Sequence, residues 1–451
     1  MSKNYLEQLA EMGHSLRWED IPEAARCAAK NVVLDTIGAI LAGSRLQENA
    51  AFAQLAPRLG GKGTASIFGH STQVPALFAA LVNATAGVAL EVDEGNRLGG
   101  GHPSIHVTPG AIAVAEELGL SGTEVLMGII LGYEVISRIG TGTSVKEEVH
   151  SHGTWGTIGS AAATARLMGF NESQIQQAMN LSMSMSPANT WTPCLEGATI
   201  RNLYPGRSSF QGIMAAHLVE CGFSSVEDGP ADLYGGILGE GFDPESVVEG
   251  LGEPGKYRIQ QNYFKMHACC LYNHPVLDAV QDLQEREEFG AGQVSQVRVV
   301  TPAIALIMAD TVPQNMLAAK FSIPFAVASA LVLGRTDVGA FMPEKVANPE
   351  VLAMAQKVTV TADEAMSLRR YDYPAARVSI TLDNGRVLEE SVTVQRGDAK
   401  NPISRQQLED KFTELSRGVL GEDRTLRVID VVQRLDELSD IRHLTRLLRI
   451  G

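Results

Sequence analysis

Apolar segments rich in alanine and glycine recur through the first 265 or so residues, and they constrain the fold more than any other feature. Their apolar and small residues are spaced as on helices, and small side chains let helices approach closely. We therefore predict one compact helical region. A helix is also predicted from Pro22 to Gly43, with Asp20 as its N-cap. The recurring segments include VPALFAALVNATAGVAL, GTEVLMGIILGYEVISRIG, GTIGSAAATARLMG and SSFQGIMAAHLVECG.

The pattern changes after Cys270, where predicted strands alternate with helices. QVSQVRVV and VTVTADEA read as strands, and LAAKFSIPFAVASALVLG reads as a helix. ARVSITL and RVLEESVTV are joined by Asp383, Asn384 and Gly385, which is a strong hairpin signal. Beyond Gly397 a charged amphipathic pattern returns to helix, with Ser404 as the predicted N-cap.

The predicted fold is mainly α with a smaller α+β domain. The large all-helical domain is expected to combine residues 1–268 with residues 398–451, and the α+β domain of residues 269–397 is inserted between them. This arrangement would leave a cleft between the two domains, where ligand sites are favoured.

Charge and composition limit the classes of partner. The net charge of −15 makes nucleic acid and membrane surfaces poor partners, because phosphate binding needs a basic surface. The N-terminus has no apolar core of a secretory signal, and the most apolar stretches fall short of the roughly 20 residues of a membrane span. The five cysteines lack CxxC spacing, so neither a disulfide framework nor a zinc ribbon is indicated. We expect a cytoplasmic protein.

Four segments combine ionisable groups with unusual backbone. They suit an acid/base loop, a carboxylate held by N–H groups at a helix N-terminus, a guanidinium fork, and a base or anion anchor. Each also has a plain alternative, namely a solvated loop, surface histidines, solvated arginines or a snorkelling lysine. The four are the acidic stretch from Glu91 to Asn96 with the following His102; His150 and His152 before the Gly-rich turn at Thr157; Arg201 and Arg207; and Lys265, His267 and His274 around Cys269 and Cys270.

Metal binding is the competing use of the histidines. His102 and His106 are four residues apart, yet Pro103 and Pro109 argue against one continuous helix bearing both. HExxH and CxxC spacings are missing from the sequence, as are GxGxxG after a strand, GxxxxGK[ST] and GxSxG. A metal-dependent hydrolase and a binding protein without catalysis both stay open as distant alternatives. The hydrolase would use His102, His106, His150 and His152.

Taken together and in order, these segments resemble the MmgE/PrpD family, whose members include 2-methylcitrate dehydratases, cis-aconitate decarboxylases and iminodisuccinate epimerases. The resemblance implies a helical domain made from both chain ends, an α+β lid domain, a homodimer, and chemistry without metal or organic cofactor. The matching segments are LDTIGAILAG, the acidic loop followed by GHPS and TPGAIAVAEEL, HSHGTWGTIGSAAATARLMG, KMHACCLYNHP and AAKFSIPFAVASAL.

Family members move a proton at a carbon α to a carboxylate, and such a proton needs cations or N–H donors that hold the carboxylate as it gains enolate character. The resemblance makes His102 and His150 acid/base candidates and Lys265 a carboxylate anchor or proton donor. Asp93 would orient an imidazole or act as a base. His106 is expected to pack or cap. The predicted substrate-binding residues are Arg201, Thr157, His274, Glu91 and Asn96.

Two residues depart from the family pattern. Arg201 stands where the decarboxylases and dehydratases carry a lysine, and Phe325 stands where a tyrosine is expected. Arginine does not donate a proton near neutral pH, so Arg201 would be restricted to binding. The expected activity is that of a cofactor-independent lyase, a dehydratase or decarboxylase of a small di- or tricarboxylic acid. The alternative is an epimerase of a dicarboxylate such as iminodisuccinate.

Overall fold

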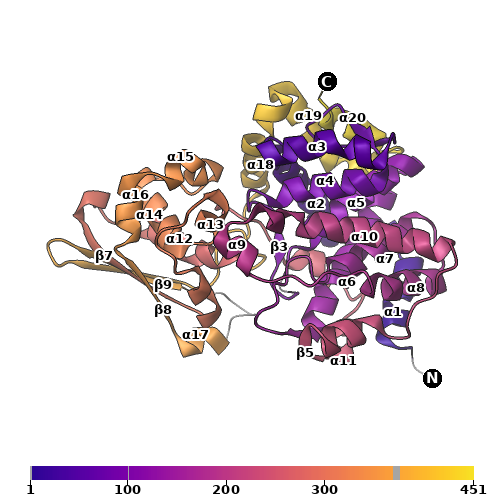
Figure 1. Cartoon of the computed structure of the whole chain (residues 1–451), viewed down its shortest axis with the longest axis horizontal. Coiled ribbons are helices and arrows are strands. Elements are labelled where there is room, and N and C mark those ends of the chain that lie inside the picture. Colours follow the sequence, from indigo (N-terminus) through magenta and orange to yellow (C-terminus); the bar gives the residue numbers. More distant parts are fainter. Residues whose placement is uncertain (1–2, 100, 369–375, 451) are drawn as a thin grey trace.

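A computed structural model describes residues 3–99, 101–368 and 376–450. Figure 1 shows two parts side by side, a large helical part and a smaller part that contains both helices and strands. The prediction of a mainly α fold with a smaller α+β domain is confirmed. We call the smaller part the lid.

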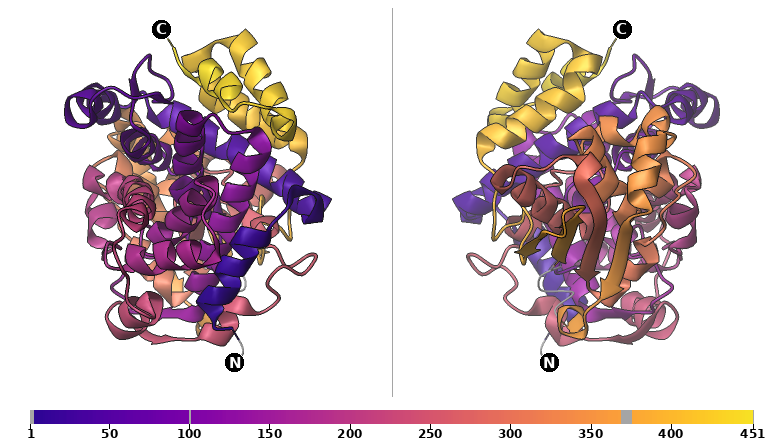
Figure 2. Two further views of the ribbon diagram at one scale, coloured as in Figure 1. Left: turned by 90° about the vertical axis from the view of Figure 1, so that its right-hand side faces the viewer. Right: turned by 90° about the vertical axis from the view of Figure 1, so that its left-hand side faces the viewer.

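The helical part takes segments from both ends of the chain. Figure 2 shows the C-terminal helices, in yellow, beside the indigo and purple N-terminal helices in both views. Phe412 and Val428 from the C-terminal segment join Ile37 in one hydrophobic core. The helices are α1 (Tyr5–Ser15), α2 (Glu23–Gly43), α3 (Gln47–Gly60), α4 (Ala76–Val88), α5 (Pro103–Leu118), α6 (Gly122–Gly142), α7 (Gly156–Leu167), α8 (Glu172–Met183), α10 (Leu203–Glu220), α11 (Pro244–Val248), α18 (Arg405–Leu420), α19 (Glu422–Gln433) and α20 (Arg442–Leu448).

Small residues bring these helices together, as the sequence pattern predicts. A Cβ added at Gly159 on α7 would lie 2.6 Å from the carbonyl oxygen of Gly132 on α6. The two backbones therefore cross at a distance that only glycine permits. Three short ribbons complete the helical part: β1 (Ala65–Ser66) with β2 (Gln73–Val74), β3 (Gly95–Asn96) with β6 (Asn262–Tyr263), and β4 (Thr143–Val145) with β5 (Gly239–Phe242).

The lid is a four-stranded sheet with order β10-β9-β7-β8 and helices packed against it. β7 runs parallel to β8 and antiparallel to β9. The predicted hairpin is confirmed, since β9 and β10 pair across a turn in which Gly385 has φ +82°. The short helix α9 (Thr192–Glu196) lies against the lid, and its Cys194 joins the lid core. The remaining lid elements are α12 (His274–Arg286), α13 (Met316–Lys320), α14 (Ile323–Leu333), α15 (Pro343–Val346), α16 (Pro349–Ala355), α17 (Glu364–Leu368), β7 (Val294–Thr301), β8 (Val358–Ala362), β9 (Ala376–Leu382) and β10 (Val387–Val392).

Helix boundaries differ from the predicted ones at three places. Ser404 caps α18 as predicted, but Asp20 ends a 3-10 turn and Pro22 precedes α2 without a side-chain cap. The predicted single helix around the FSIP sequence is divided, because Ser322 caps a new helix, α14. His102 lies outside α5 as its N-cap, so no single helix bears both His102 and His106, but the interruption expected at Pro109 is wrong. Helix α5 begins at Pro103, where a missing N–H carries no penalty, and it continues through Pro109.

One apolar helix reaches the length of a membrane span, although the sequence predicts only shorter apolar segments. α6 has 21 residues and a hydropathy sufficient to cross a membrane, but 89% of its most apolar window is buried inside the protein. A buried core helix passes the same test of length and composition, so this helix is weak evidence for a membrane span.

Candidate active site

A cavity of about 640 Å³ lies where the helical part meets the lid. The lid contributes Cys270, Leu271, Tyr272, Ile304 and Phe321 to its wall. Several residues predicted for the site line the cavity from the helical part, namely Glu91, Asn96, His102, His150 and Arg201. Asp93 and Lys265 lie one layer behind this wall, in contact with Glu91 or His102.

Four buried ionised side chains form a compact network at the cavity floor. Glu91 lies between two cations, with Oε1 2.5 Å from Arg201 Nη1 and Oε2 2.8 Å from Lys265 Nζ. Lys265 Nζ is also 3.5 Å from Asp93 Oδ1. All four side chains are at most 2% exposed. The plain alternatives of a solvated arginine and a snorkelling lysine are therefore wrong for Arg201 and Lys265.

Mutual attraction keeps these groups charged. Burial acts against the charge of Lys265, but the carboxylates of Glu91 and Asp93 raise its pKa to about 12. Burial likewise opposes the charge on Asp93, yet Lys265 and His102 hold the pKa of its carboxyl below the usual range. The network has two positive and two negative charges. A carboxylate bound in the cavity would therefore contact an Arg201 side chain whose positive charge is already balanced by Glu91.

The backbone of Glu91 is in the left-handed region, with φ +54°, which is unusual for a residue with a side chain. Two lysines, the buried Lys320 and the partly buried Lys411, fix the flanking carbonyl groups. Lys320 Nζ donates to the Leu90 carbonyl at 2.9 Å, and Lys411 Nζ donates to the Val92 carbonyl at 2.8 Å. One lysine belongs to the lid and the other to α18. Both parts of the fold therefore hold the conformation that places the Glu91 carboxylate.

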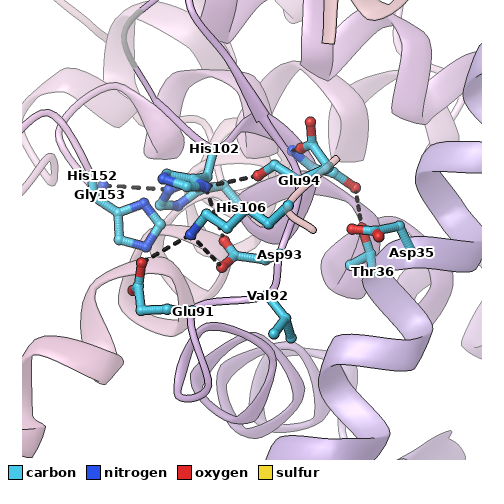
Figure 3. A network of polar contacts seen from close by, with 12 residues as sticks. Asp35, Thr36, Glu91, Val92, Asp93, Glu94, His102, His106, His152 and Gly153 are labelled. Atoms are coloured by element: carbon cyan, nitrogen blue, oxygen red, sulfur yellow. Dashed lines mark hydrogen bonds and ion pairs between the residues drawn. The ribbon is translucent and has the colours of Figure 1, made fainter. Parts of the chain in front are cut away.

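His102 is held by its Nδ1 atom at the start of α5. Nδ1 lies 2.7 Å from the main-chain carbonyl oxygen of Glu94 and 3.2 Å from Asp93 Oδ2. Both neighbours are acceptors, so Nδ1 carries the hydrogen and neutral His102 has its lone pair on Nε2. Figure 3 shows His102 above Asp93 and beside Glu94 in this network. The geometry suits a general base whose orientation is fixed by the acidic loop.

His150 is held in the opposite tautomer. The backbone N–H of His152 donates to His150 Nδ1 at 2.9 Å, so neutral His150 carries its hydrogen on Nε2. Its ring stacks on Trp191 with the centroids 4.0 Å apart. Burial, followed by the charge of Arg201, lowers the pKa of His150 well below its ordinary value. His150 therefore stays neutral and presents an N–H donor.

His106 and His152 are buried beside the two predicted histidines. The ring of His152 meets those of His102 and His106 edge to face, at centroid distances of 4.7 and 5.0 Å. The position of His106 agrees with packing, since its Nε2 accepts a hydrogen bond from the Gly153 N–H and burial lowers its pKa to about 3. His152 is only 1% exposed, so the alternative of surface histidines is wrong there. The sequence signal for His152 was its place two residues after His150.

The carboxyl group of Glu94 supports the same loop from inside. It accepts hydrogen bonds from the Ser104 N–H at 2.7 Å and from the Tyr133 hydroxyl at 2.9 Å. Glu94 therefore holds His102 with its carbonyl oxygen and the first turn of α5 with its side chain. Burial raises the pKa of the Glu94 carboxyl to about 8.

The raised pKa of Glu94 predicts a pH-dependent stability. The folded state holds this proton more tightly than the unfolded state, whose pKa is near 4.5. The stabilisation is therefore complete below that value and is lost as the pH rises to about 8. A glutamine at 94 keeps an acceptor for Ser104 and does not ionise. In urea denaturation, Glu94→Gln should match the wild type near pH 5 and exceed it by several kcal/mol, to order of magnitude, at pH 8.5. Parallel pH profiles for the two proteins would contradict this explanation.

The other predicted residues are arranged differently. Asn96 lines the cavity but uses its side chain on the loop, donating to the Arg258 carbonyl and accepting from the Leu98 N–H. Thr157 and His274 are buried outside the cavity wall, and their predicted role in substrate binding stays a prediction. Phe325 packs against Phe341 in the lid core, so the departure from tyrosine there does not alter the cavity wall.

Metal coordination finds little support in this geometry. Within residues 3–99, 101–368 and 376–450, no group of three or more His, Cys, Asp or Glu side chains is arranged to hold a metal ion. The histidine rings contact one another edge to face, and His102 uses Nδ1 on the acidic loop.

Comparisons with known proteins extend over both parts of the fold. Residues 7–238 match the model of the MmgE/PrpD N-terminal domain, and residues 267–437 match that of the MmgE/PrpD C-terminal domain. Cis-aconitate decarboxylase of Aspergillus terreus is 25% identical over 470 residues, covering 98% of this chain and 95% of the relative. The cis-aconitate decarboxylases of Mus musculus and Homo sapiens are each 24% identical, covering 100% of this chain and 94% and 95% of the relatives.

Proposed function

The chain belongs to the MmgE/PrpD family, and from that premise we propose that it is a cofactor-independent lyase acting on a small di- or tricarboxylic acid. The observation that carries the proposal is the pair of oppositely fixed histidines at one cavity. Neutral His102 has its lone pair on Nε2, and neutral His150 has its hydrogen on Nε2. The names of the decarboxylase relatives support the same reaction class.

Each group has a distinct task in such a reaction. Arg201 Nε, buried without a hydrogen-bond partner in the part of the chain that the structure describes, suits a substrate carboxylate. His102 Nε2 takes or returns the proton at the carbon α to a carboxylate. The His150 Nε2–H donates to the carboxylate as it gains enolate charge, which lowers the barrier without a second proton transfer. Lys265 acts behind Glu91, where its charge offsets the carboxylates of Glu91 and Asp93 that would otherwise repel an anion in the cavity.

The properties of the two histidines favour a lyase over an epimerase. An epimerase that inverts a carbon with two bases needs both groups to exchange protons with that carbon. His150 has its hydrogen on Nε2 and a pKa well below the ordinary value, so it is a poor proton acceptor at the cavity. One proton-transferring imidazole and one fixed donor are sufficient for loss of either CO2 or water. For loss of CO2, protonated His102 gives its proton to the carbon; for loss of water, His102 takes the proton from the α carbon and gives it to the departing hydroxyl.

The test is product analysis with a panel of di- and tricarboxylates that includes cis-aconitate, followed by proton NMR in D2O. A new alkene, or CO2 released in proportion to substrate consumed, is the expected result. Exchange with solvent deuterium and inversion without a new alkene would assign the chain to the epimerases. A panel that shows neither turnover nor exchange, or one tightly bound zinc per chain in protein purified without a histidine tag, would overturn the proposal.

A further inference from the structure

Tyr263 lies in the cavity wall next to His102. It belongs to β6, which pairs with β3 so that Tyr263 is opposite Gly95. The Tyr263 and His102 rings meet edge to face with their centroids 6.2 Å apart. Strand pairing therefore attaches the phenol to the same loop that orients His102. No sequence pattern indicated this residue, because two-residue strands are too short to show one.

The hydroxyl group of Tyr263 makes no hydrogen bond to any residue of the described ranges, although the side chain is only 3% exposed. Three other buried tyrosines use their hydroxyl groups on the protein itself. The hydroxyl of Tyr133 donates to Glu94, that of Tyr204 to the Thr190 carbonyl, and that of Tyr234 to the Thr154 carbonyl. Buried tyrosine hydroxyls ordinarily find a partner. Since Tyr263 lines the cavity, a molecule in the cavity can supply that partner.

Gly95 makes room for this phenol. A Cβ at position 95 would overlap the hydroxyl oxygen and the ring of Tyr263. Gly95 is not among the residues with positive φ, so its backbone does not require glycine. The close approach of Tyr263 is the physical reason for a glycine here.

The surroundings keep the phenol protonated. Burial raises the pKa of Tyr263 well above its ordinary value, and the nearby Cys270, Asp93 and Glu94 act in the same direction. A neutral phenol next to a carboxylate donates a hydrogen bond and keeps its proton.

We propose that Tyr263 is a further catalytic residue, whose hydroxyl donates a hydrogen bond to the substrate carboxylate nearest to His102. This inference rests on the proposed lyase function. No bond to Tyr263 forms or breaks, because the proton is moved by His102. The hydrogen bond strengthens as the carboxylate gains enolate charge, so the contribution extends from substrate binding to the transition state.

The test compares Tyr263→Phe with Tyr204→Phe. Tyr204 is a matched control because its ring meets that of His150 at the same centroid distance, 6.2 Å, while its hydroxyl is directed at a main-chain carbonyl. For a substrate identified in the panel, Tyr263→Phe should lower kcat/KM about 10- to 100-fold, and Tyr204→Phe less than about threefold. Calorimetric titration with succinate and tricarballylate should show weaker binding only for Tyr263→Phe.

A second variant, Gly95→Ala, gives an independent readout, since the added methyl group displaces the phenol. Its effect on kcat/KM should be largely lost when it is combined with Tyr263→Phe. If the wild type turns over a substrate and folded Tyr263→Phe has the same kcat/KM, the role of Tyr263 is overturned. The lyase proposal would still stand in that case. A wild type that neither binds the two probes nor turns over any panel substrate would overturn both.

Discussion

His102→Asn is expected to lower kcat/KM by about 10²- to 10⁴-fold, which is the usual contribution of a general acid/base. Asparagine retains an N–H donor for the Glu94 carbonyl and is a favoured residue at the N-terminus of a helix. The substitution therefore removes the ionisable Nε2 and leaves the local hydrogen bond and the start of α5 in place. Steady-state kinetics with a substrate from the panel measure the effect.

The control for His102→Asn is His106→Gln. His106 is one turn further along α5, and a glutamine oxygen there can still accept from the Gly153 N–H. Its kcat/KM should fall less than about tenfold, because it loses no proton-transferring group. Equal losses of activity in the two variants, with both still folded by circular dichroism, would remove His102 from the role assigned to it.

Lys265→Met should destabilise the protein by about 3–5 kcal/mol, the usual cost of removing one partner from a buried ion network. The methionine fills similar space but leaves Glu91 and Asp93 without their shared cation. Glu91→Gln combined with Lys265→Met should recover part of the loss, since only one of the two carboxylates then remains charged. Urea denaturation of the single and double variants at neutral pH measures the coupling.

An exposed lysine provides the comparison for Lys265. Lys3 pairs with Glu172 and Glu11 at the surface, with its side chain 42% exposed. Lys3→Met should therefore leave the free energy of unfolding close to that of the wild type. Equal losses of unfolding free energy in Lys265→Met and Lys3→Met would contradict the stability assigned to the buried network. So would a double variant, Glu91→Gln with Lys265→Met, that is no more stable than Lys265→Met alone.

The fold was largely predictable because its signals are local. Alanine and glycine at helical spacing predict the core helices, and the Asn384-Gly385 turn predicts the β9–β10 hairpin. Helix starts were less predictable. Asp20 is a good capping residue by type, yet Pro22 takes the N-cap position of α2. Pro109 does not interrupt α5, which is buried along most of its length. Tertiary burial overrides local preference in such cases.

The candidate site was predictable only in part. Its acidic loop, histidines and Lys265 stood out because ionisable groups are rare in such apolar segments. The left-handed backbone of Glu91 could not be predicted, because Lys320 and Lys411, which fix it, come from segments hundreds of residues away. Tyr263 could not be predicted for a similar reason, since its position depends on the pairing of its strand with Gly95, a residue distant in the sequence.

Proton transfer by His102 at the carbon α to a carboxylate is the central claim, and deuterium labelling tests it most directly. The wild type and His102→Asn are incubated in D2O with a substrate of the wild type, and the product and recovered substrate are analysed by NMR. If CO2 is lost, the wild type should place one solvent deuterium at that carbon of the product; if water is lost, the wild type should release deuterium from substrate labelled at that carbon and turn that substrate over more slowly than the unlabelled one. His102→Asn should show neither the change of label nor product at comparable enzyme concentration. CO2 lost without solvent deuterium at that carbon of the product, water lost without release of deuterium from that carbon, or a full change of label by His102→Asn would contradict the account.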